Sequence, residues 1–305
     1  MFVAPENFNK TFTITDDTLV SDLKNASDWD IALRYHEFKS NPHFKEIIRN
    51  LRKVSALAVL RQAQAIIGSV VKPKYVLSVP VVIAADLSEF ELDLDETIEH
   101  APWFGNPDKA IELSDLWIEK SFQRTQPLII TVDTSLSMTG EKLALTAVAL
   151  AVVLLEFPDD PIGIIAFESE AKIIKMPSER LTVFELVERF LDVPAQGYTH
   201  LEDGIKKSLK LLLKIKTEAG IGARPASVVL LTDGKYTAGR DPAYLTKDMN
   251  HLVVLKIGRD RSSVALCQEM AKLGHSVMKE VGNLESLPNI MYGVVKDLLR
   301  GRALR

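Results

Sequence analysis

The second part of the chain alternates short apolar runs with stretches of helical periodicity. The apolar runs read as strands: PLIITVD, IGIIAFE, AKIIKM, ASVVLLTD, HLVVLKIG and HSVMKEV. Between them, the spacing of apolar residues predicts helices over residues 141–157, about 180–191, about 200–216, about 263–273 and from about 284 onward. Alternation of this kind predicts an α/β fold, in which helices cover both faces of a mainly parallel sheet.

Individual runs refine this picture. The segments LIITV, VVLL and LVVL are apolar on both sides, as expected for strands that are covered on both faces. AKIIKM follows IGIIAFE after too few residues for a helical crossover, so we expect an antiparallel strand at an edge of the sheet. The helix over residues 141–157 is apolar nearly all round, but it is shorter than the ~20 residues of a membrane span. We therefore expect a buried helix against the sheet.

Helical signals dominate before residue 125. Ser27 with Asp30 resembles a capping box, and Asn41-Pro42 is a favourable helix start. Apolar residues then recur at helical spacing: Phe44, Ile47, Ile48, Leu51, Val54 and Ala58. The segment VLSVPVVIAAD indicates a small strand element. The predicted organisation is a mostly helical region over residues 1–122, with that strand element, followed by an α/β domain over residues 123–305.

Composition narrows the class of protein. The chain has 305 residues, 47% of them hydrophobic and 26% charged, which supports a sizeable core in a folded protein. A net charge of −4 with scattered basic residues argues against nucleic acid as a partner. Cys267 is the sole cysteine and excludes an internal disulfide, and the first residues, MFVAPENFNK, lack the pattern of a secretory leader. We expect a cytoplasmic protein without a membrane span.

Candidate chemistry gathers where two of the predicted central strands end. The stretch TVDTSLSMTG places Asp133, Ser135 and Ser137 after one strand, and Asp233 ends ASVVLLTD. Thr199 lies in AQGYTHLEDG, a loop that leads into a helix. Ligands of open α/β sheets bind outside the carboxyl ends of the strands. The three loops therefore deliver two carboxylates and three hydroxyls to one edge of the sheet.

Oxygen ligands of this kind suit a hard divalent cation, Mg²⁺ with Mn²⁺ as the alternative. Two carboxylates leave such an ion able to accept one more anionic oxygen, such as a partner's Asp or Glu. Other interpretations of these residues are a scaffold with a vestigial metal site, a hydrolase nucleophile or a phosphate loop. The chain has no G-x-S-x-G elbow and no G-x-x-x-x-G-K-[ST] motif, which argues against the last two.

The three pieces DTSLS, Thr199 in GYTHL, and TDG at Asp233 resemble the metal-ion-dependent adhesion site (MIDAS) of von Willebrand factor A (VWA) domains. Their order and spacing are similar to the family pattern over about residues 125–303. The resemblance implies a Rossmann-like fold with Asp133, Ser135, Ser137, Thr199 and Asp233 as direct or water-mediated ligands of Mg²⁺ or Mn²⁺. Leu136 replaces a glycine that is common in intracellular members, and His200 stands where an aspartate is frequent.

With its helical first part and without a secretory leader, the chain resembles intracellular VWA proteins of the CoxE and ViaA type, which work with MoxR-type AAA+ ATPases. The segment LDLDETIE is also similar to sequences before the VWA domain in such proteins. The resemblance implies a non-enzymatic adaptor that couples an ATPase to a client in metal-cofactor insertion or complex maturation. The alternatives are an exported adhesion or ligand-binding protein, and a metal-dependent hydrolase in which His200 is the residue to mutate.

The acidic stretch over residues 86–99 contains seven Asp or Glu residues and no Lys or Arg. We expect a solvated strand edge that leads into a helix, with Asp95 and Glu96 favoured at its N-terminus. A basic partner or a second cation is the functional alternative. The stretch lacks the glycine and spacing of an EF-hand.

Overall fold

A computed structural model describes residues 26–67, 74–81, 91–100, 112–123, 127–195, 197–218 and 225–299. The chain forms two compact units, which we call the large unit (Met1–Ser69 with Gln126–Arg305) and the small unit (Val70–Thr125). The N-terminal helices thus group with the α/β part of the chain. The domain boundary between residues 122 and 123 stays a prediction.

The large unit is built on a six-stranded sheet. Its strands lie in the order β6 (Ala171–Lys175), β5 (Ile162–Phe167), β4 (Leu128–Asp133), β7 (Ser227–Thr232), β8 (Leu252–Ile257) and β9 (Met278–Val281). β5 pairs antiparallel with the edge strand β6, and the other pairs are parallel. Every residue of β4, β5, β7 and β8 is buried, as their apolar runs predict. The predicted α/β fold and its antiparallel edge strand are confirmed.

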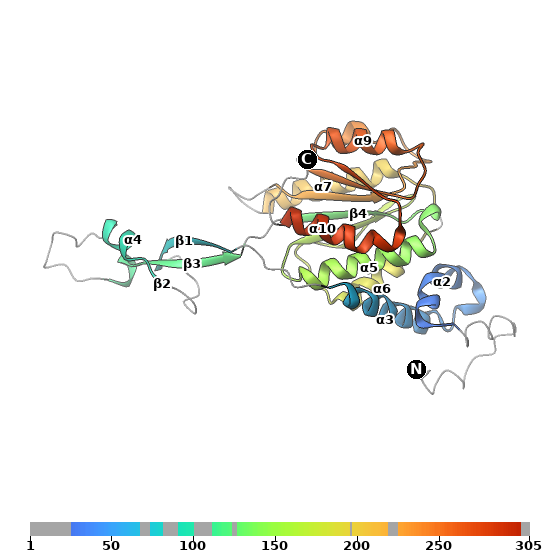
Figure 1. The fold of residues 1–305 in the computed structure, drawn as a ribbon, viewed down its shortest axis with the longest axis horizontal. Helices are drawn as coiled ribbons and strands as arrows, with labels where there is room; N and C mark the ends of the chain where they lie inside the picture. Colours follow the sequence, from blue (N-terminus) through green and yellow to red (C-terminus); the bar gives the residue numbers. More distant parts are fainter. Residues whose placement is uncertain are drawn as a thin grey trace. The chain divides into compact units, whose positions relative to one another are not determined.

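Helices cover both faces of this sheet (Figure 1). One face carries α7 (Leu201–Glu218), α8 (Ala243–Thr246) and α9 (Val264–Leu273), which enclose a core that includes Ile205, Val228 and Met270. The opposite face carries α5 (Glu141–Glu156), α6 (Val183–Leu191) and α10 (Leu287–Leu299). α5 is buried over most of its length, as expected.

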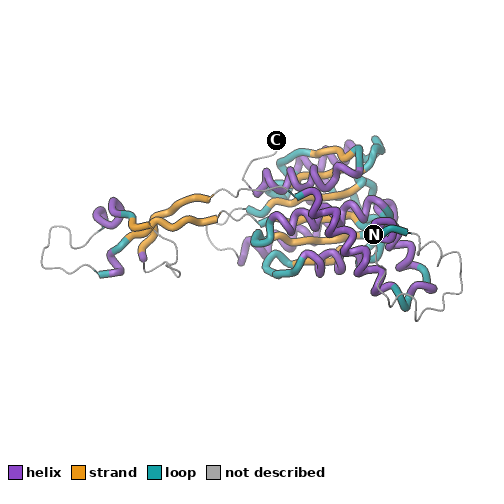
Figure 2. Tube along the Cα trace, turned by 60° about the horizontal axis from the view of Figure 1, so that its bottom comes forward, coloured by secondary structure: helices purple, strands orange, loops and turns teal. Residues whose placement is uncertain are grey.

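Two N-terminal helices form a further layer outside α5 and α6. They are α2 (Asp28–Ser40) and α3 (Ile48–Ile66), and α3 contacts both α5 and α6. Figure 2 shows the helices of the large unit, in purple, packed over its strands, in orange. The predicted capping box is confirmed, since the Ser27 hydroxyl accepts the N–H of Asp30 at 3.1 Å and Asp30 Oδ2 accepts the N–H of Ser27 at 3.0 Å. Asn41-Pro42 starts a single 3-10 turn, η2 (Pro42–Phe44), and the α-helix begins only at Ile48.

Lys39 anchors α2 to the end of α6. Its ammonium donates to the carbonyls of Leu191 and Val193, each at 3.3 Å, and to that of Asp192. A cation at the C-terminus of a helix complements the partial negative charge of the helix dipole. Arg52 of α3 adds ion pairs to Glu188, at 3.3 Å, and Asp192. The N-terminal helices are therefore joined to α6 by charge as well as by apolar packing.

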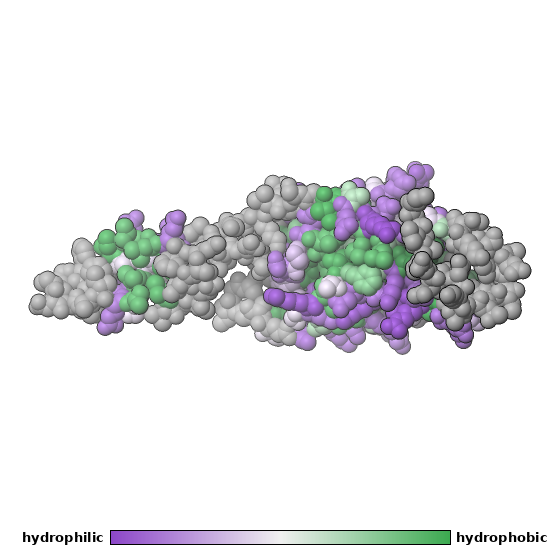
Figure 3. Space-filling view, turned by 90° about the horizontal axis from the view of Figure 1, so that it is seen from below, coloured by the Kyte–Doolittle hydropathy of each residue, from purple (hydrophilic) through white to green (hydrophobic). Residues whose placement is uncertain are grey.

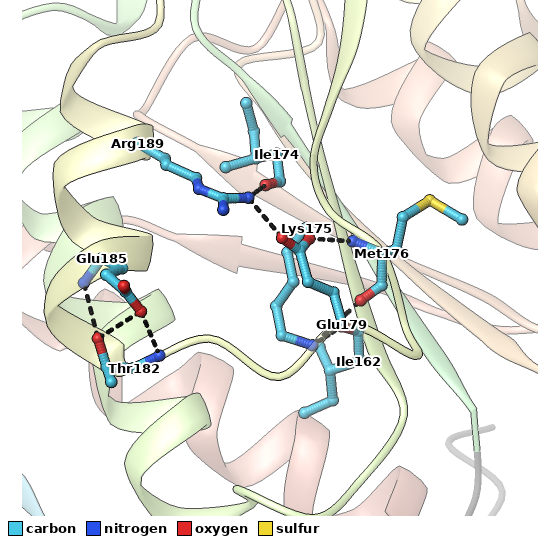
Figure 4. A network of polar contacts seen from close by, with 8 residues as sticks. All are labelled: Ile162, Ile174, Lys175, Met176, Glu179, Thr182, Glu185 and Arg189. Atoms are coloured by element: carbon cyan, nitrogen blue, oxygen red, sulfur yellow. Dashed lines mark hydrogen bonds and ion pairs between the residues drawn. The ribbon is translucent and has the colours of Figure 1, made fainter.

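The edge strand β6 is held by a polar network (Figure 4). The Lys175 ammonium donates to the carbonyls of Ile162, at 2.9 Å, and Met176, at 3.2 Å. Arg189 pairs with Glu179 at 2.8 Å, which ties α6 to the turn after β6. At the start of α6, Thr182 and Glu185 form a capping box. β6 is thus fixed to β5 on one side and to α6 on the other.

The small unit contains an antiparallel sheet in the order β1 (Lys74–Pro80), β3 (Trp117–Gln123) and β2 (Glu91–Leu92). A short helix, α4 (Leu94–Glu99), follows β2, and a 3-10 turn, η4 (Leu113–Asp115), precedes β3. Asp95 and Glu96 lie in the first turn of α4, as predicted, and Asp93 caps it by accepting the N–H of Glu96 at 3.0 Å. Residues 86–90 of the acidic stretch and residues 82–86 of VLSVPVVIAAD lie outside the described residues. Among the described helices, none is both long enough and apolar enough to span a bilayer.

Candidate metal centre and its rim

The two predicted carboxylate ligands lie at the carboxyl ends of neighbouring strands. β4 and β7 run parallel with Val132 opposite Leu231. Asp133 is the last residue of β4, and Asp233 directly follows β7. The Thr232 hydroxyl donates to Asp133 Oδ2 at 2.9 Å across the two strands. The sheet register therefore brings both aspartates to one edge, as the sequence predicts.

The DTSLS loop folds back on its own aspartate. Asp133 Oδ1 accepts the N–H of Ser135 at 2.9 Å, and the hydroxyls of Ser135 and Ser137 lie 3.2 Å apart. A 3-10 turn, η5 (Leu136–Met138), and Gly140 with φ +69° complete the connection to α5. Asp133 and Ser135 are buried, whereas Ser137 is exposed. Three of the five predicted ligands are thus neighbours in space.

Thr199 is held against the loop that follows β7. Its N–H donates to the Thr237 hydroxyl at 2.9 Å, and its carbonyl accepts the N–H groups of Thr237 at 3.0 Å and Ala238 at 3.3 Å. Asp233 belongs to the same loop, where its Oδ1 accepts the N–H of Lys235 at 3.0 Å. Direct hydrogen bonds therefore join the β7 loop to the loop before α7, as Thr232 joins β7 to β4.

Two oxygens of the set are left for a ligand. In the part of the chain that the structure describes, neither the Thr199 hydroxyl nor Asp233 Oδ2 takes part in a hydrogen bond, although Thr199 is 5% and Asp233 6% exposed. Neither oxygen is among the fully buried side-chain atoms that lack a partner, so both remain accessible to water or to an ion. The structure brings together the loops that carry all five predicted residues, and their role as metal ligands stays a prediction.

The electrostatics of Asp133 fit a cation. Burial, together with the smaller effect of the charge of Asp233, raises the pKa of Asp133 to about 6, against the hydrogen bonds from Ser135 and Thr232, which lower it. A divalent ion would favour the ionised form of both carboxylates. Among the described residues, no group of three or more His, Cys, Asp or Glu side chains is placed to hold a metal. The donor set here, with its two carboxylates and three hydroxyls, suits a hard cation rather than a soft one.

Glu202 also lies at this edge, although no sequence motif marks it. Its carboxylate accepts the N–H of Arg240 at 2.9 Å, the Tyr244 hydroxyl at 2.7 Å and the Lys206 ammonium at 2.6 Å. These contacts, the Arg240 N–H first, lower the pKa of Glu202 to about 2. The sequence feature that could have identified Glu202 is its position as an acidic residue in the first turn of a predicted helix. His200 lies between this carboxylate, 3.8 Å from its Nε2, and the carbonyl of Ser169, 3.1 Å from its Nδ1.

Large apolar side chains stand exposed around the same edge. Leu136 is 64%, Tyr198 69% and Tyr236 38% exposed, and each comes from a different one of the three loops. We call these three residues the rim. Leu136 lies between two predicted ligands, Tyr198 precedes Thr199, and Tyr236 precedes Thr237. The sequence marks Leu136 as unusual, but it carries no signal that the two tyrosines are exposed.

Gly234 places the Asp233 loop against α9. Its φ is +76°, and an added Cβ would lie 2.5 Å from the Cys267 sulfur and 2.9 Å from Ser263 Cβ. The Ser263 hydroxyl donates to the carbonyl of Asp233 at 2.6 Å. Cys267 is fully buried, as expected for a core residue, and burial raises its pKa to about 11. The glycine of TDG is thus required both by the backbone conformation and by the close approach of α9.

A doubly wound sheet with oxygen-rich loops at the carboxyl ends of adjacent strands defines a class of ligand-binding α/β domains. Residues 128–235 match the sequence model of the von Willebrand factor type A domain, and this range includes all three loops. This part of the chain is thus similar to VWA domains. Domains of this type generally act as protein-interaction modules and typically bind a divalent metal at a MIDAS.

Individual relatives match over part of their length. Inter-alpha-trypsin inhibitor heavy chain H4 of Sus scrofa is 29% identical over 132 residues, which are 41% of this chain and 14% of that protein. Among solved structures, a von Willebrand factor type A protein from Catenulispora acidiphila gives a TM-score of 0.48 at 15% identity, covering 60% of this chain and 45% of its own. Proximal thread matrix protein 1 from the mussel byssus, with a zinc-occupied MIDAS motif, gives 0.49 at 17% identity, covering 58% and 48%.

Proposed function

We propose that this protein is a non-enzymatic interaction protein that binds partners through a divalent cation. Asp133, Ser135, Ser137, Thr199 and Asp233 hold Mg²⁺, or Mn²⁺, and an Asp or Glu of the partner completes the coordination. The observation that carries the proposal is the hydrogen bonding that joins the three loops, Asp133 to Thr232 and Thr199 to Thr237. These contacts hold the three loops that carry the predicted ligands at one edge of the sheet.

The rim supports a protein as the ligand. Exposed aromatic and aliphatic side chains of this size are typical of surfaces that bind other proteins. Leu136, Tyr198 and Tyr236 are exposed, and each lies in a different one of the three loops that carry the predicted ligands. An acidic residue on the metal would fix the partner's position, and the rim would bury apolar side chains next to it.

We propose a MoxR-type AAA+ ATPase as the partner and the cytoplasm as the place of action. The support is the resemblance of the helical region and the VWA motifs to proteins that work with such ATPases. The chain has no G-x-x-x-x-G-K-[ST] motif of its own, so nucleotide hydrolysis in this scheme belongs to the partner. The protein would couple that ATPase to a client during complex maturation or metal-cofactor insertion.

Substitution of Asp133 tests the metal-dependent docking. Asp133→Ala is expected to weaken Mg²⁺ or Mn²⁺ binding in calorimetry and to lose partner capture in a pull-down, while circular dichroism shows a retained fold. Asp248→Ala is the matched control, since Asp248 is an exposed aspartate of the same unit. Unchanged metal affinity in Asp133→Ala would refute the site, and unchanged capture would refute its docking role.

Affinity purification from the native host tests the partner. The tagged protein is purified in Mg²⁺ and, in parallel, in EDTA, and bound proteins are identified by mass spectrometry. We expect an AAA+ ATPase that is present with Mg²⁺ and absent with EDTA. An ATPase retained in EDTA would contradict metal-dependent docking, and no ATPase in either sample would contradict the choice of partner.

Two assays separate this proposal from the alternatives. Recovery of the protein outside the cell in a secretion assay would favour an exported adhesion protein. Ester or phosphoester hydrolysis that disappears in His200→Ala would favour a metal-dependent hydrolase. We expect neither result.

A further inference from the structure

Among the described residues of the small unit, four large apolar side chains are exposed. Leu92 is 45%, Leu94 60%, Ile98 44% and Leu113 72% exposed. Leu94 and Ile98 are four residues apart on α4 and therefore share one face of that helix. We call these four residues the apolar face. Figure 3 shows apolar side chains gathered on the described part of this unit, with polar ones beside them.

The apolar face lies where three elements meet at the start of β3. The N–H of Asp93 donates to the carbonyl of Trp117 at 2.9 Å, and the N–H of Trp117 donates to the Thr97 hydroxyl at 2.9 Å. The His100 ring stacks on Trp117 with centroids 4.4 Å apart. These contacts join β2 and α4 to β3, and η4, which carries Leu113, directly precedes that strand. The four residues thus belong to one end of the small sheet.

The small unit turns other side chains inward. Thr97 is 3% and Ile118 0% exposed, although each is close in sequence or in register to a residue of the apolar face. The small unit therefore has a packed interior, and the four exposed residues lie outside it. Large apolar side chains that are exposed near one another are typical of surfaces that bind another protein.

The charge of the small unit indicates which kind of molecule would bind the apolar face. The small unit contains 11 Asp or Glu residues and 5 Lys or Arg, whereas the rest of the chain contains 30 and 32. The net negative charge of the protein thus resides in this unit. Exposed carboxylates stand next to the apolar face in sequence: Glu91, Asp95, Glu99 and Glu112. Among the described residues, none of these four forms an ion pair.

We propose that the apolar face is a docking site for an amphipathic, basic segment of a partner protein, in which leucine-like side chains alternate with Lys or Arg. The partner's apolar residues would cover Leu94, Ile98 and Leu113, and its cations would face Asp95 and Glu99. A second copy of the same face is disfavoured, because both would carry the same negative charge. Anionic membrane surfaces are disfavoured for the same reason.

This site is separate from the metal centre. It lies in the small unit, uses no predicted metal ligand and needs no divalent cation. Its occupation is therefore expected in EDTA and in the Asp133→Ala variant. The two proposals can fail independently of each other.

The test uses the full chain in EDTA and a labelled amphipathic peptide of about 18 residues, or five helical turns, composed of Leu and Lys. Comparison peptides replace each Lys by Glu, or scramble the order of Leu and Lys. We expect fluorescence anisotropy to show binding of the Leu/Lys peptide at least about tenfold tighter than that of either comparison peptide, and weaker binding as salt rises.

Variants then locate the binding. The double variant Leu94→Ser with Leu113→Ser is expected to lose at least about tenfold in affinity for the Leu/Lys peptide. The matched control is Leu213→Ser, a leucine of α7 in the large unit that is 64% exposed. Asp95→Asn with Glu99→Gln is expected to weaken binding and to reduce its salt dependence. Thermal unfolding by circular dichroism confirms that each variant folds.

Three results would overturn the proposal. The first is equal affinity for the Leu/Lys and Leu/Glu peptides, and the second is an equal loss in Leu213→Ser and in the double variant. The third is the absence of binding to the Leu/Lys peptide at millimolar concentration. Concentration-dependent dimerisation that Leu94→Ser with Leu113→Ser abolishes, measured by sedimentation, would instead assign the face to a second copy.

Discussion

The Thr232 hydroxyl donates a hydrogen bond of 2.9 Å to the buried carboxylate of Asp133, and it also accepts the N–H of Gly234 at 3.0 Å. One side chain thus fixes an oxygen of the first predicted ligand and the backbone of the loop that carries the last. Thr232→Val keeps the shape of the side chain and removes both contacts. We expect a loss of about 1–3 kcal/mol in the free energy of unfolding, because a buried carboxylate oxygen is left unsatisfied.

Urea unfolding measures this loss. The control is Thr217→Val, at an exposed threonine of α7 whose hydroxyl donates to the carbonyl of Lys214 at 2.8 Å. That change is expected to stay within about 0.5 kcal/mol. Equal stability of Thr232→Val and the unsubstituted protein would contradict the role given to this hydrogen bond.

The metal centre predicts that stabilisation by Mg²⁺ depends on Asp133. Asp133→Asn removes a buried charge but also one of the two oxygens that accept hydrogen bonds, so in EDTA we expect the two proteins to differ by no more than about 2 kcal/mol. With Mg²⁺ at about 100 times its Kd, the unsubstituted protein should gain about 2.7 kcal/mol, and the variant should gain far less. Thermal unfolding with and without Mg²⁺ tests both halves. A variant that is stabilised as much as the unsubstituted protein would exclude Asp133 as a ligand.

The hydrogen bonds of Lys39 are expected to stabilise the contact between α2 and α6. Lys39→Met keeps the apolar stem but removes the donor to the carbonyls at the end of α6. We expect a loss of about 1–3 kcal/mol and faster amide exchange in α2 by hydrogen–deuterium exchange. Lys53→Met, at an exposed position of α3, is the control. Slow exchange in α2 of Lys39→Met would show that apolar packing alone holds the helix.

His36 predicts a dependence of stability on pH. Burial, helped by the charge of Lys39, lowers the pKa of His36 to about 4, and among the described residues no group hydrogen-bonds its Nε2. The unfolded chain, with a histidine pKa near 6.5, therefore binds the proton first as the pH falls. Stability is expected to be full above about pH 6.5 and to decline toward pH 4, by up to about 3 kcal/mol from this residue.

Comparison with His36→Asn isolates that contribution from the carboxylates that titrate in the same range. The difference in unfolding free energy between the unsubstituted protein and the variant should shrink as the pH falls from 7 to 4. Parallel pH profiles of the two proteins would show that His36 does not titrate as inferred.

Substitution of Gly234 by alanine is expected to carry a steric cost that the same substitution at Gly258 does not. Both have positive φ, +76° and +88°, but a Cβ at Gly258 would have no atom within 4 Å, whereas at Gly234 it would meet the Cys267 sulfur. Gly258→Ala is expected to cost about 1–2 kcal/mol for the backbone alone. Gly234→Ala should cost about 1–3 kcal/mol more, because the core must move. Equal losses in urea unfolding would contradict the close packing of α9 on this loop.

Sequence patterns predicted the elements of the sheet well because burial on both faces requires runs of apolar residues. β7 and β8 are fully buried and were found in this way, and the edge position of β6 followed from a short connection. Helix starts were less well predicted. The helix expected from about residue 284 begins with a 3-10 turn and becomes α-helical at Leu287, since local capping decides the first turn.

The residues of the site could likewise be predicted only in part. Asp133 and Asp233 could be placed together because parallel strands end at one edge of the sheet. Thr232, Thr237 and Glu202 could not, since their contacts depend on the register of β4 with β7 and on how the loops close. The spacing of apolar residues in α3 indicated a buried face, but not that α5 and α6 would cover it.

The contact between α3 and α5 has a consequence for folding during synthesis on the ribosome. α3 ends at Ile66, and α5, the first helix of the α/β core that it contacts, begins at Glu141. At about 5–20 residues per second, a ribosome would need roughly 4–15 seconds to synthesise the intervening chain. During that interval α2 is the only described helix that can cover α3, although α3 also packs on α5 and α6 in the folded protein. The nascent N-terminal helices are therefore a natural target for chaperones until the α/β core emerges.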